Sequence, residues 1–141
     1  MNRRLVVVGG GVMASSLKHF ESESIKFAGP LSREPLRRLY ARASALIFPG
    51  IEDFGIVPVE AQAAGCPVIA LGQGGALETV RDGETGLFFQ ERSIDSLCNA
   101  MERFEGMRFD RQHIQESAGE FSTERFHARM RDALRRLGVE V

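Results

Sequence analysis

Four short stretches of the chain are continuously apolar and rich in β-branched residues. They are RLVVVG (4–9), IKFAG (25–29), ALIFPG (45–50) and PVIALG (67–72). Apolar runs without alternation are typical of strands that are covered on both faces. A shorter run, ETGLFFQ (84–90), predicts a fifth strand.

Segments with helical spacing separate these strands. Segment 32–44 places its apolar residues at i, i+3, i+4 and i+7, and Ser32 is placed to cap its start. Segment 56–65 predicts a short helix that ends at Gly65. Segment 75–83 predicts another short helix, similar in length to that of segment 56–65. Strands that alternate with helices in this way predict the α/β class, with a Rossmann-like, doubly wound parallel sheet.

The strand signal stops after residue 91, and the carboxyl-terminal part is predicted to be helical. Segments 93–105 and 110–119 are the first two helices, and a third begins at Ser122. The predicted apolar faces are Ile94, Leu97, Cys98 and Met101 for the first helix, and Phe126, Met130, Ala133, Leu134 and Leu137 for the last. Arginines fill the other faces of the last helix, which predicts a solvated surface or contact with an acidic partner.

The composition and net charge of the chain argue against several classes of function. The chain has 141 residues, the usual size of one domain, and a formal net charge of -1, which gives no general reason to expect nucleic acid or an anionic membrane as a partner. No apolar run is long enough to cross a bilayer, and the apolar piece near the start is too short for a signal peptide, so we expect a cytoplasmic location. Cys66 and Cys98 lack the spacing of a zinc site and are expected to be buried or partly buried free thiols.

Ligands of open parallel sheets bind beyond the carboxyl ends of the strands, so we considered the loops there. Gly9, Gly11 and Ala14 fit the G-x-G-x-x-A dinucleotide pattern, but the second predicted strand ends in glycine and proline where an acidic residue is needed to hold a ribose. A nicotinamide or flavin site is therefore disfavoured. The glycines let a ligand approach the backbone or simply form a tight turn. The loop that contains Leu31 either contacts a nucleotide base through its backbone or is an ordinary proline turn.

The third loop, GIEDFG (50–55), leads from a strand into the helix predicted from residue 56. Backbone amides near Gly55 and Ile56 would face an anion such as a diphosphate. Glu52 lies in this loop and Glu60 in the helix, and carboxylates accept the paired hydroxyls of a ribose or a sugar. An acidic residue near a helix start also stabilises the helix by itself, which would explain Glu60 but explains Glu52 less well.

The sequence EDFGIVPVE, with seven residues between Glu52 and Glu60, is followed by AQAAGCPVIALGQGGALETVRDGETGLFF. This region resembles the EX7E signature of retaining glycosyltransferases of family 4, which have the GT-B fold. The resemblance runs from about Leu5 to Glu105 and is most specific from Phe48 to Phe89. It implies two Rossmann-like domains that face a cleft, with residues 1–141 as the single carboxyl-terminal, sugar-nucleotide-binding domain.

The resemblance also implies roles for individual residues. Glu60 would hold the ribose of the donor, and Glu52 would face the transferred sugar as the catalytic residue. The amides of Phe54, Gly55 and Ile56 would lie beside the sugar and the phosphate. The remaining donor-binding positions are Leu31 near the base, and Gly10 and Gly11 near the cleft. The loop formed by Gln73, Gly74 and Gly75 would stabilise the neighbouring turn.

The chain departs from the family pattern in two respects. It lacks the upstream arginine and lysine that hold the donor diphosphate, so we expect its first strand and the amino-terminal acceptor domain to be missing. Gly9, Gly10 and Gly11 stand where relatives have a GDGP-like turn. Catalysis needs positive charge at the leaving group and a closed cleft, so the chain alone is expected to bind weakly and to transfer little.

The predicted function is transfer of a mannose- or glucose-type sugar from a UDP-, GDP- or ADP-sugar to an acceptor hydroxyl with retained configuration. No metal or other cofactor is expected, and His19, His113 and His127 are scattered. The acceptor would be a glycan or lipid-linked glycan held by the missing domain, with the full-length enzyme located peripherally at the inner membrane. A non-catalytic nucleotide-binding module and a UDP-sugar epimerase of the same fold remain alternatives.

Overall fold

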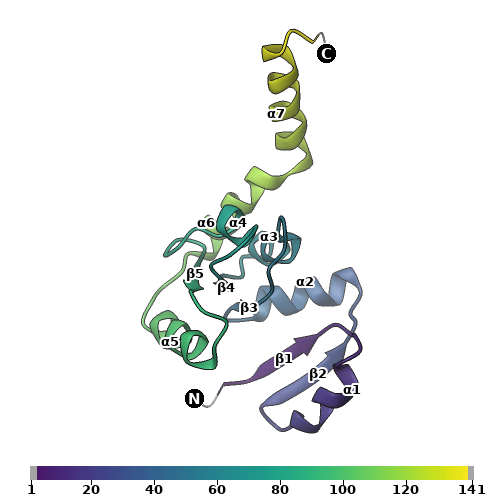
Figure 1. The fold of residues 1–141 in the computed structure, drawn as a ribbon, viewed down its shortest axis with the longest axis vertical. Coiled ribbons are helices and arrows are strands. Elements are labelled where there is room, and N and C mark those ends of the chain that lie inside the picture. The colour runs from purple at the N-terminus through teal and green to yellow at the C-terminus, as the bar shows by residue number, and fades with distance from the viewer. Residues whose placement is uncertain (1–2, 140–141) are drawn as a thin grey trace. The chain divides into compact units, whose positions relative to one another are not determined.

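The computed structural model describes residues 3–139, which form two compact units, Met1–Leu36 and Arg37–Val141 (Figure 1). The first unit contains strand β1 (Leu5–Val8), helix α1 (Ala14–Leu17), a 3₁₀ turn and strand β2 (Ile25–Gly29). The two strands pair in parallel, with Leu5 opposite Ile25. The first two predicted strands are therefore confirmed.

The strands of the first unit are less covered than their apolar sequence predicts. Leu5 and Val6 in β1 keep 40% and 41% of their surfaces exposed, and β2 alternates between half-buried and exposed residues. The prediction that each strand is covered on both faces is wrong here. Helix α1 and the 3₁₀ turn have only four and three residues, too few to cover both faces of a two-stranded sheet.

The second unit contains a three-stranded parallel sheet in the order β3 (Leu46–Phe48), β4 (Val68–Leu71), β5 (Gly86–Phe89). All four residues of the central strand β4 are buried, as a continuous apolar run predicts. The α/β class and the parallel pairing are confirmed. The hydrogen-bonded ladders form two sheets, β1-β2 and β3-β4-β5, where the sequence analysis expected one.

Helices connect and follow these strands. Helix α2 (Arg33–Arg42) precedes β3, α3 (Ile56–Ala63) connects β3 to β4, and α4 (Ala76–Thr79) connects β4 to β5. Helices α5 (Ile94–Glu105), α6 (Arg111–Ala118) and α7 (Thr123–Arg136) then follow, with a short 3₁₀ turn (Gly119–Phe121) between the last two. Segment 75–83 is helical over only four residues, because Val80 is extended and the Thr85 hydroxyl accepts a hydrogen bond from the Arg81 amide.

Helix α3 ends at the glycine that the sequence marks. Gly65 has a φ of +74°, and its amide donates to the Gln62 carbonyl at 2.8 Å. The Cys66 amide donates to the Ala61 carbonyl at 2.9 Å. These two bonds form a Schellman motif, which satisfies carbonyls at the helix end and turns the chain into β4.

A hydrophobic cluster holds α5 against the three-stranded sheet. Ile69, Leu71, Phe89 and Ala100 are buried in it, and Ala45, Leu97, Met101 and Phe104 pack around them. The predicted face of α5 is therefore partly wrong: Ile94 is 81% exposed and Cys98 is also exposed. The buried stripe contains Ala100 because its small side chain lets the helix approach the sheet closely.

Helix α7 has the predicted amphipathic pattern, but most of its predicted apolar face is exposed and Leu134 is only half-buried. Phe126, Met130 and Leu137 are 57%, 45% and 78% exposed. Two of its arginines, Arg125 and Arg129, form ion pairs with Glu120 of the preceding turn. Over residues 3–139, no helix is both long and apolar enough to span a membrane.

Candidate functional site

The start of α3 is the place where the sequence predicts an anion site. Gly55 precedes the helix with a φ of +80°, which a residue with a side chain rarely adopts, and as glycine it supplies no capping oxygen. The first amides of a helix have no partner within the helix, which leaves those of Gly55, Ile56 and Val57, since Pro58 has no N–H. The first turn of α3 contains no acidic residue. The positive end of the helix dipole therefore has no compensating carboxylate in that turn.

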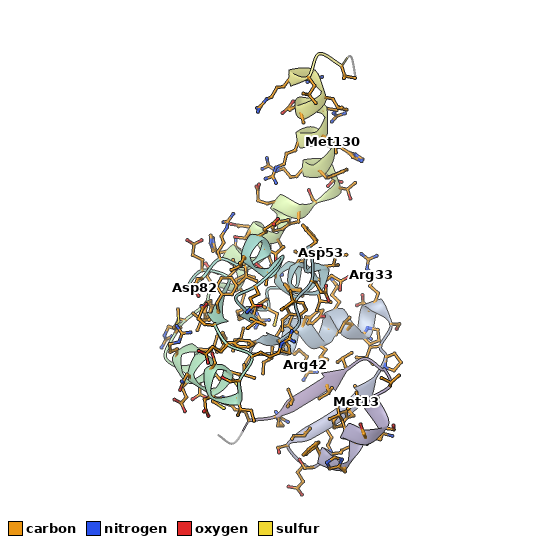
Figure 2. All side chains as sticks on the ribbon, in the orientation of Figure 1. Met13, Arg33, Arg42, Asp53, Asp82 and Met130 are labelled. Carbon is orange, nitrogen blue, oxygen red and sulfur yellow. The ribbon has the colours of Figure 1, made fainter. Side chains whose placement is uncertain are left out.

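The two predicted glutamates belong to the second unit, Arg37–Val141, and both are exposed. Glu52 lies in the loop before α3, next to Asp53, which is labelled in Figure 2. Glu60 is the fifth residue of α3, beyond the first turn in which a carboxylate stabilises the helix dipole. Stabilisation of the helix start therefore explains Glu60 less well than the sequence suggested, and the binding roles of both residues stay predictions.

The negative charge of Glu60 acts on a buried neighbour from α2. Burial raises the pKa of the Tyr40 hydroxyl, and the charge of Glu60 raises that pKa further. Tyr40 is 8% exposed. The carboxylate of Glu60 is thus close to the end of α2 while it remains accessible to solvent.

The loop after β4 supports the loop that carries Glu52. The Gly75 amide donates to the Glu52 carbonyl at 2.7 Å. A β-carbon on Gly74 would lie 2.6 Å from the same carbonyl oxygen, so the two backbones are in direct contact. The prediction that the loop of Gln73, Gly74 and Gly75 stabilises the neighbouring turn agrees with this geometry.

Three predicted site residues belong to the other unit. Gly10 and Gly11 follow β1 and are exposed, and a β-carbon on either would meet no atom within 4 Å. Leu31 is half-buried and lies two residues before α2. The structure thus brings Glu52, Phe54–Ile56 and Glu60 together in one unit, and Gly10, Gly11 and Leu31 in the other.

The sequence analysis missed two buried polar residues beneath the site. Gln62 and Thr79 are 1% and 3% exposed, and each donates a side-chain hydrogen bond to a backbone carbonyl. Gln62 is the only polar residue in the stretch AQAAG, a signal that could have marked it. Buried amides in a helix that packs on a sheet are uncommon, and they fix the position of whatever they bind.

The site offers carboxylates and backbone amides, and metal ligands are not grouped there. Among residues 3–139, no three histidine, cysteine, aspartate or glutamate side chains are placed to share a metal ion. Both cysteines are free thiols, with Cys66 buried and Cys98 exposed. The carboxylates of the candidate site can accept hydrogen bonds from hydroxyls, and its backbone amides can donate them to an anion.

The fold is that of known glycosyltransferases. A sucrose-phosphate synthase structure from Thermosynechococcus elongatus aligns with a TM-score of 0.77 and 27% identity, over 95% of this chain and 38% of that one. The Anabaena protein HepE, solved in complex with UDP, aligns with a TM-score of 0.71 and 22% identity, over 94% of this chain and 40% of that one. This agreement confirms one half of a GT-B fold as the architecture.

The family follows from the sequence comparison. Residues 1–121 match the model of the glycosyl transferases group 1 family, and the chain belongs to that family. A GDP-mannose-dependent alpha-(1-6)-phosphatidylinositol monomannoside mannosyltransferase of Mycobacterium tuberculosis is 36% identical over 110 residues, which are 69% of this chain and 29% of that protein. The chain thus spans less than a third of the length of this curated relative. The predicted resemblance to a glycosyltransferase family is confirmed.

Proposed function

We propose that this chain is the donor-binding part of a retaining glycosyltransferase. In this proposal it binds a nucleoside-diphosphate sugar whose mannose- or glucose-type sugar is transferred to an acceptor hydroxyl. The observation that carries the proposal is the uncompensated start of α3, which lies between the exposed carboxylates of Glu52 and Glu60. A helix start favours the diphosphate, and the two carboxylates suit the hydroxyls on either side of it.

Each residue has one task in this proposal. The amides of Phe54, Gly55 and Ile56 hold the phosphate and the sugar. Glu60 accepts hydrogen bonds from the ribose hydroxyls, and Glu52 accepts them from the transferred sugar. The hydrogen bonds from these amides stabilise the leaving diphosphate as negative charge develops on it, and the two carboxylates orient the donor.

The transfer step exchanges one bond at the anomeric carbon for another. The bond from the anomeric carbon to the phosphate oxygen breaks, and a bond to the acceptor oxygen forms on the same face of the sugar. The acceptor proton passes to the leaving phosphate, so no metal, redox group or other cofactor enters the step. Gly10, Gly11 and Leu31 belong to the first unit, and their assignment to donor binding, with Leu31 near the base, stays a prediction.

The acceptor is assigned to a second domain that lies outside residues 1–141. The curated relative and the solved structures are all much longer than this chain, which supports a two-domain enzyme. A second domain would also exclude water from the reacting sugar. Residues 1–141 by themselves are therefore expected to bind the donor weakly and to transfer little.

A titration with UDP, GDP and ADP, followed by NMR through the amides of Gly55, Ile56 and Glu60, tests the proposal. The similar proteins suggest uracil and guanine as candidate nucleotide bases, since one solved structure contains UDP and one curated relative is GDP-mannose-dependent. We expect one nucleotide to shift these amides at millimolar concentration. No response to any of the three would refute the donor-binding role.

A further inference from the structure

Gln62 links the site helix to the segment that follows β4. Its side-chain Nε2 donates to the Pro58 carbonyl at 3.2 Å, within α3, and to the Thr79 carbonyl at 2.9 Å, at the end of α4. The side chain is 1% exposed, so no water competes for either bond. A buried amide that loses its partners is costly, and the two helices are therefore held at one separation.

Thr79 continues this link toward the loop that carries Glu52. Its hydroxyl donates to the Gly75 carbonyl at 3.0 Å, and its amide donates to the same carbonyl at 3.1 Å. The Gly75 amide then donates to the Glu52 carbonyl at 2.7 Å. The bonds from Glu52 through Gly75 and Thr79 to Gln62, together with the chain from Glu52 to Gln62, form a closed ring.

The backbone that begins α3 lies on this ring. A β-carbon on Gly55 would lie 3.6 Å from the Thr79 hydroxyl oxygen and 3.7 Å from the Ala76 nitrogen. The loop side chains themselves are exposed, with Phe54 at 45% and Ile56 at 60%. Phe54 makes one edge contact, with the ring of Phe121, so the backbone beneath the loop is the main support of the loop amides.

We propose that Gln62 is a positioning residue for the donor site. It contacts no ligand, because it is buried, but its bond to Thr79 sets the spacing between Glu52, the first amides of α3 and Glu60. This inference rests on the proposed function, in which those groups contact one donor molecule. When several groups bind one ligand, the loss of a supporting bond weakens binding, because a small displacement disrupts several contacts at once.

The test compares the wild-type chain with Gln62→Met, which keeps the length of the side chain and removes its donors. The first readout is hydrogen exchange of the Gly75 amide, expressed relative to the Leu71 amide in the central strand. We expect this ratio to rise about tenfold in Gln62→Met, because the ring opens locally while β4 stays intact. The second readout is the Kd for UDP, GDP or ADP, whichever the wild type binds, and we expect it to rise about three- to tenfold.

Two further variants keep the test decisive. Thr79→Val removes the hydroxyl bond to Gly75 with little change of shape, and it should shift both readouts in the same direction even if Gln62→Met fails to fold. Leu97→Ala destabilises the hydrophobic cluster, which contains the reference residue Leu71, without touching the ring, and it should leave the local exchange of the Gly75 amide and the Kd unchanged. Unchanged exchange and affinity in both ring variants would overturn the role of Gln62. A wild type that binds no nucleotide would instead overturn the donor-binding function.

Discussion

A β-carbon on Gly75 would lie 2.3 Å from the carbonyl carbon and the carbonyl oxygen of Phe54. This distance is far below any normal contact, and the atoms involved are backbone, so neither side can yield by changing a rotamer. Because Gly75 has no side chain, the loop that contains it can approach the loop that contains Phe54 closely. The support of the candidate site depends on this contact as much as on hydrogen bonds.

We expect Gly75→Ala to lower the free energy of unfolding by about 2–4 kcal/mol, because the loop of residues 52–55 must move away from its support. Urea unfolding followed by circular dichroism measures the change. Gly119→Ala is the matched control, because a β-carbon there meets no atom within 4 Å, and it should cost less than about 0.5 kcal/mol. A Gly75→Ala variant as stable as this control would contradict the close contact.

Glu60→Ala should weaken binding of the preferred nucleoside diphosphate at least about tenfold, equivalent to about 1.4 kcal/mol. The reason is the loss of the acceptor for the two ribose hydroxyls. Calorimetry or NMR titration gives the Kd, and Glu102→Ala on the exposed surface of α5 is the control. Equal affinity in Glu60→Ala and in the wild type would remove the ribose role from this residue.

Arg111 at the start of α6 is expected to stabilise the second unit through the end of α2. Its guanidinium donates to the carbonyls of Ala41 at 2.7 Å, Ala43 at 3.3 Å and Tyr40 at 3.4 Å. These carbonyls end α2 and carry the negative end of its dipole. Arg111→Met should therefore lower the free energy of unfolding by about 1–2 kcal/mol. A loss no larger than that of Arg108→Met, an exposed neighbour, would show that the three bonds contribute nothing.

Stability should fall in the alkaline range because of Cys66. Burial raises the pKa of its thiol from 9.0 to about 11. The unfolded chain therefore loses this proton at lower pH than the folded chain, so the stabilisation is complete below pH 9 and is lost as pH rises toward about 11. The expected slope is about 1.4 kcal/mol per pH unit between these values.

Urea unfolding in the presence of a reductant at pH 8, 9 and 10 measures this effect. Cys66→Ala removes the thiol and should flatten the dependence up to pH 10. Tyr40, whose pKa is also raised, from 10.0, adds its own loss of stability above that pH. An equally steep decline in wild type and Cys66→Ala between pH 9 and 10 would assign the effect to other groups.

The sequence by itself determined the α/β class, the strands and the end of α3. Continuous apolar runs located the five strands, and Gly65 marked the end of α3 because a left-handed backbone there favours glycine. The motif around Glu52 and Glu60 was sufficient to predict the family. These features depend on local backbone preferences and on short patterns, which the sequence records directly.

Only the tertiary structure decided which residues are buried and what supports the site. The apolar pattern of α5 is compatible with more than one face, and packing against Leu71 and Phe89 selected the stripe that contains Ala100 and exposed Ile94. The ring through Gln62 and Thr79 joins residues that are distant in sequence, so no local pattern predicts it. Such contacts form only when separate segments pack together, and burial then strengthens each hydrogen bond.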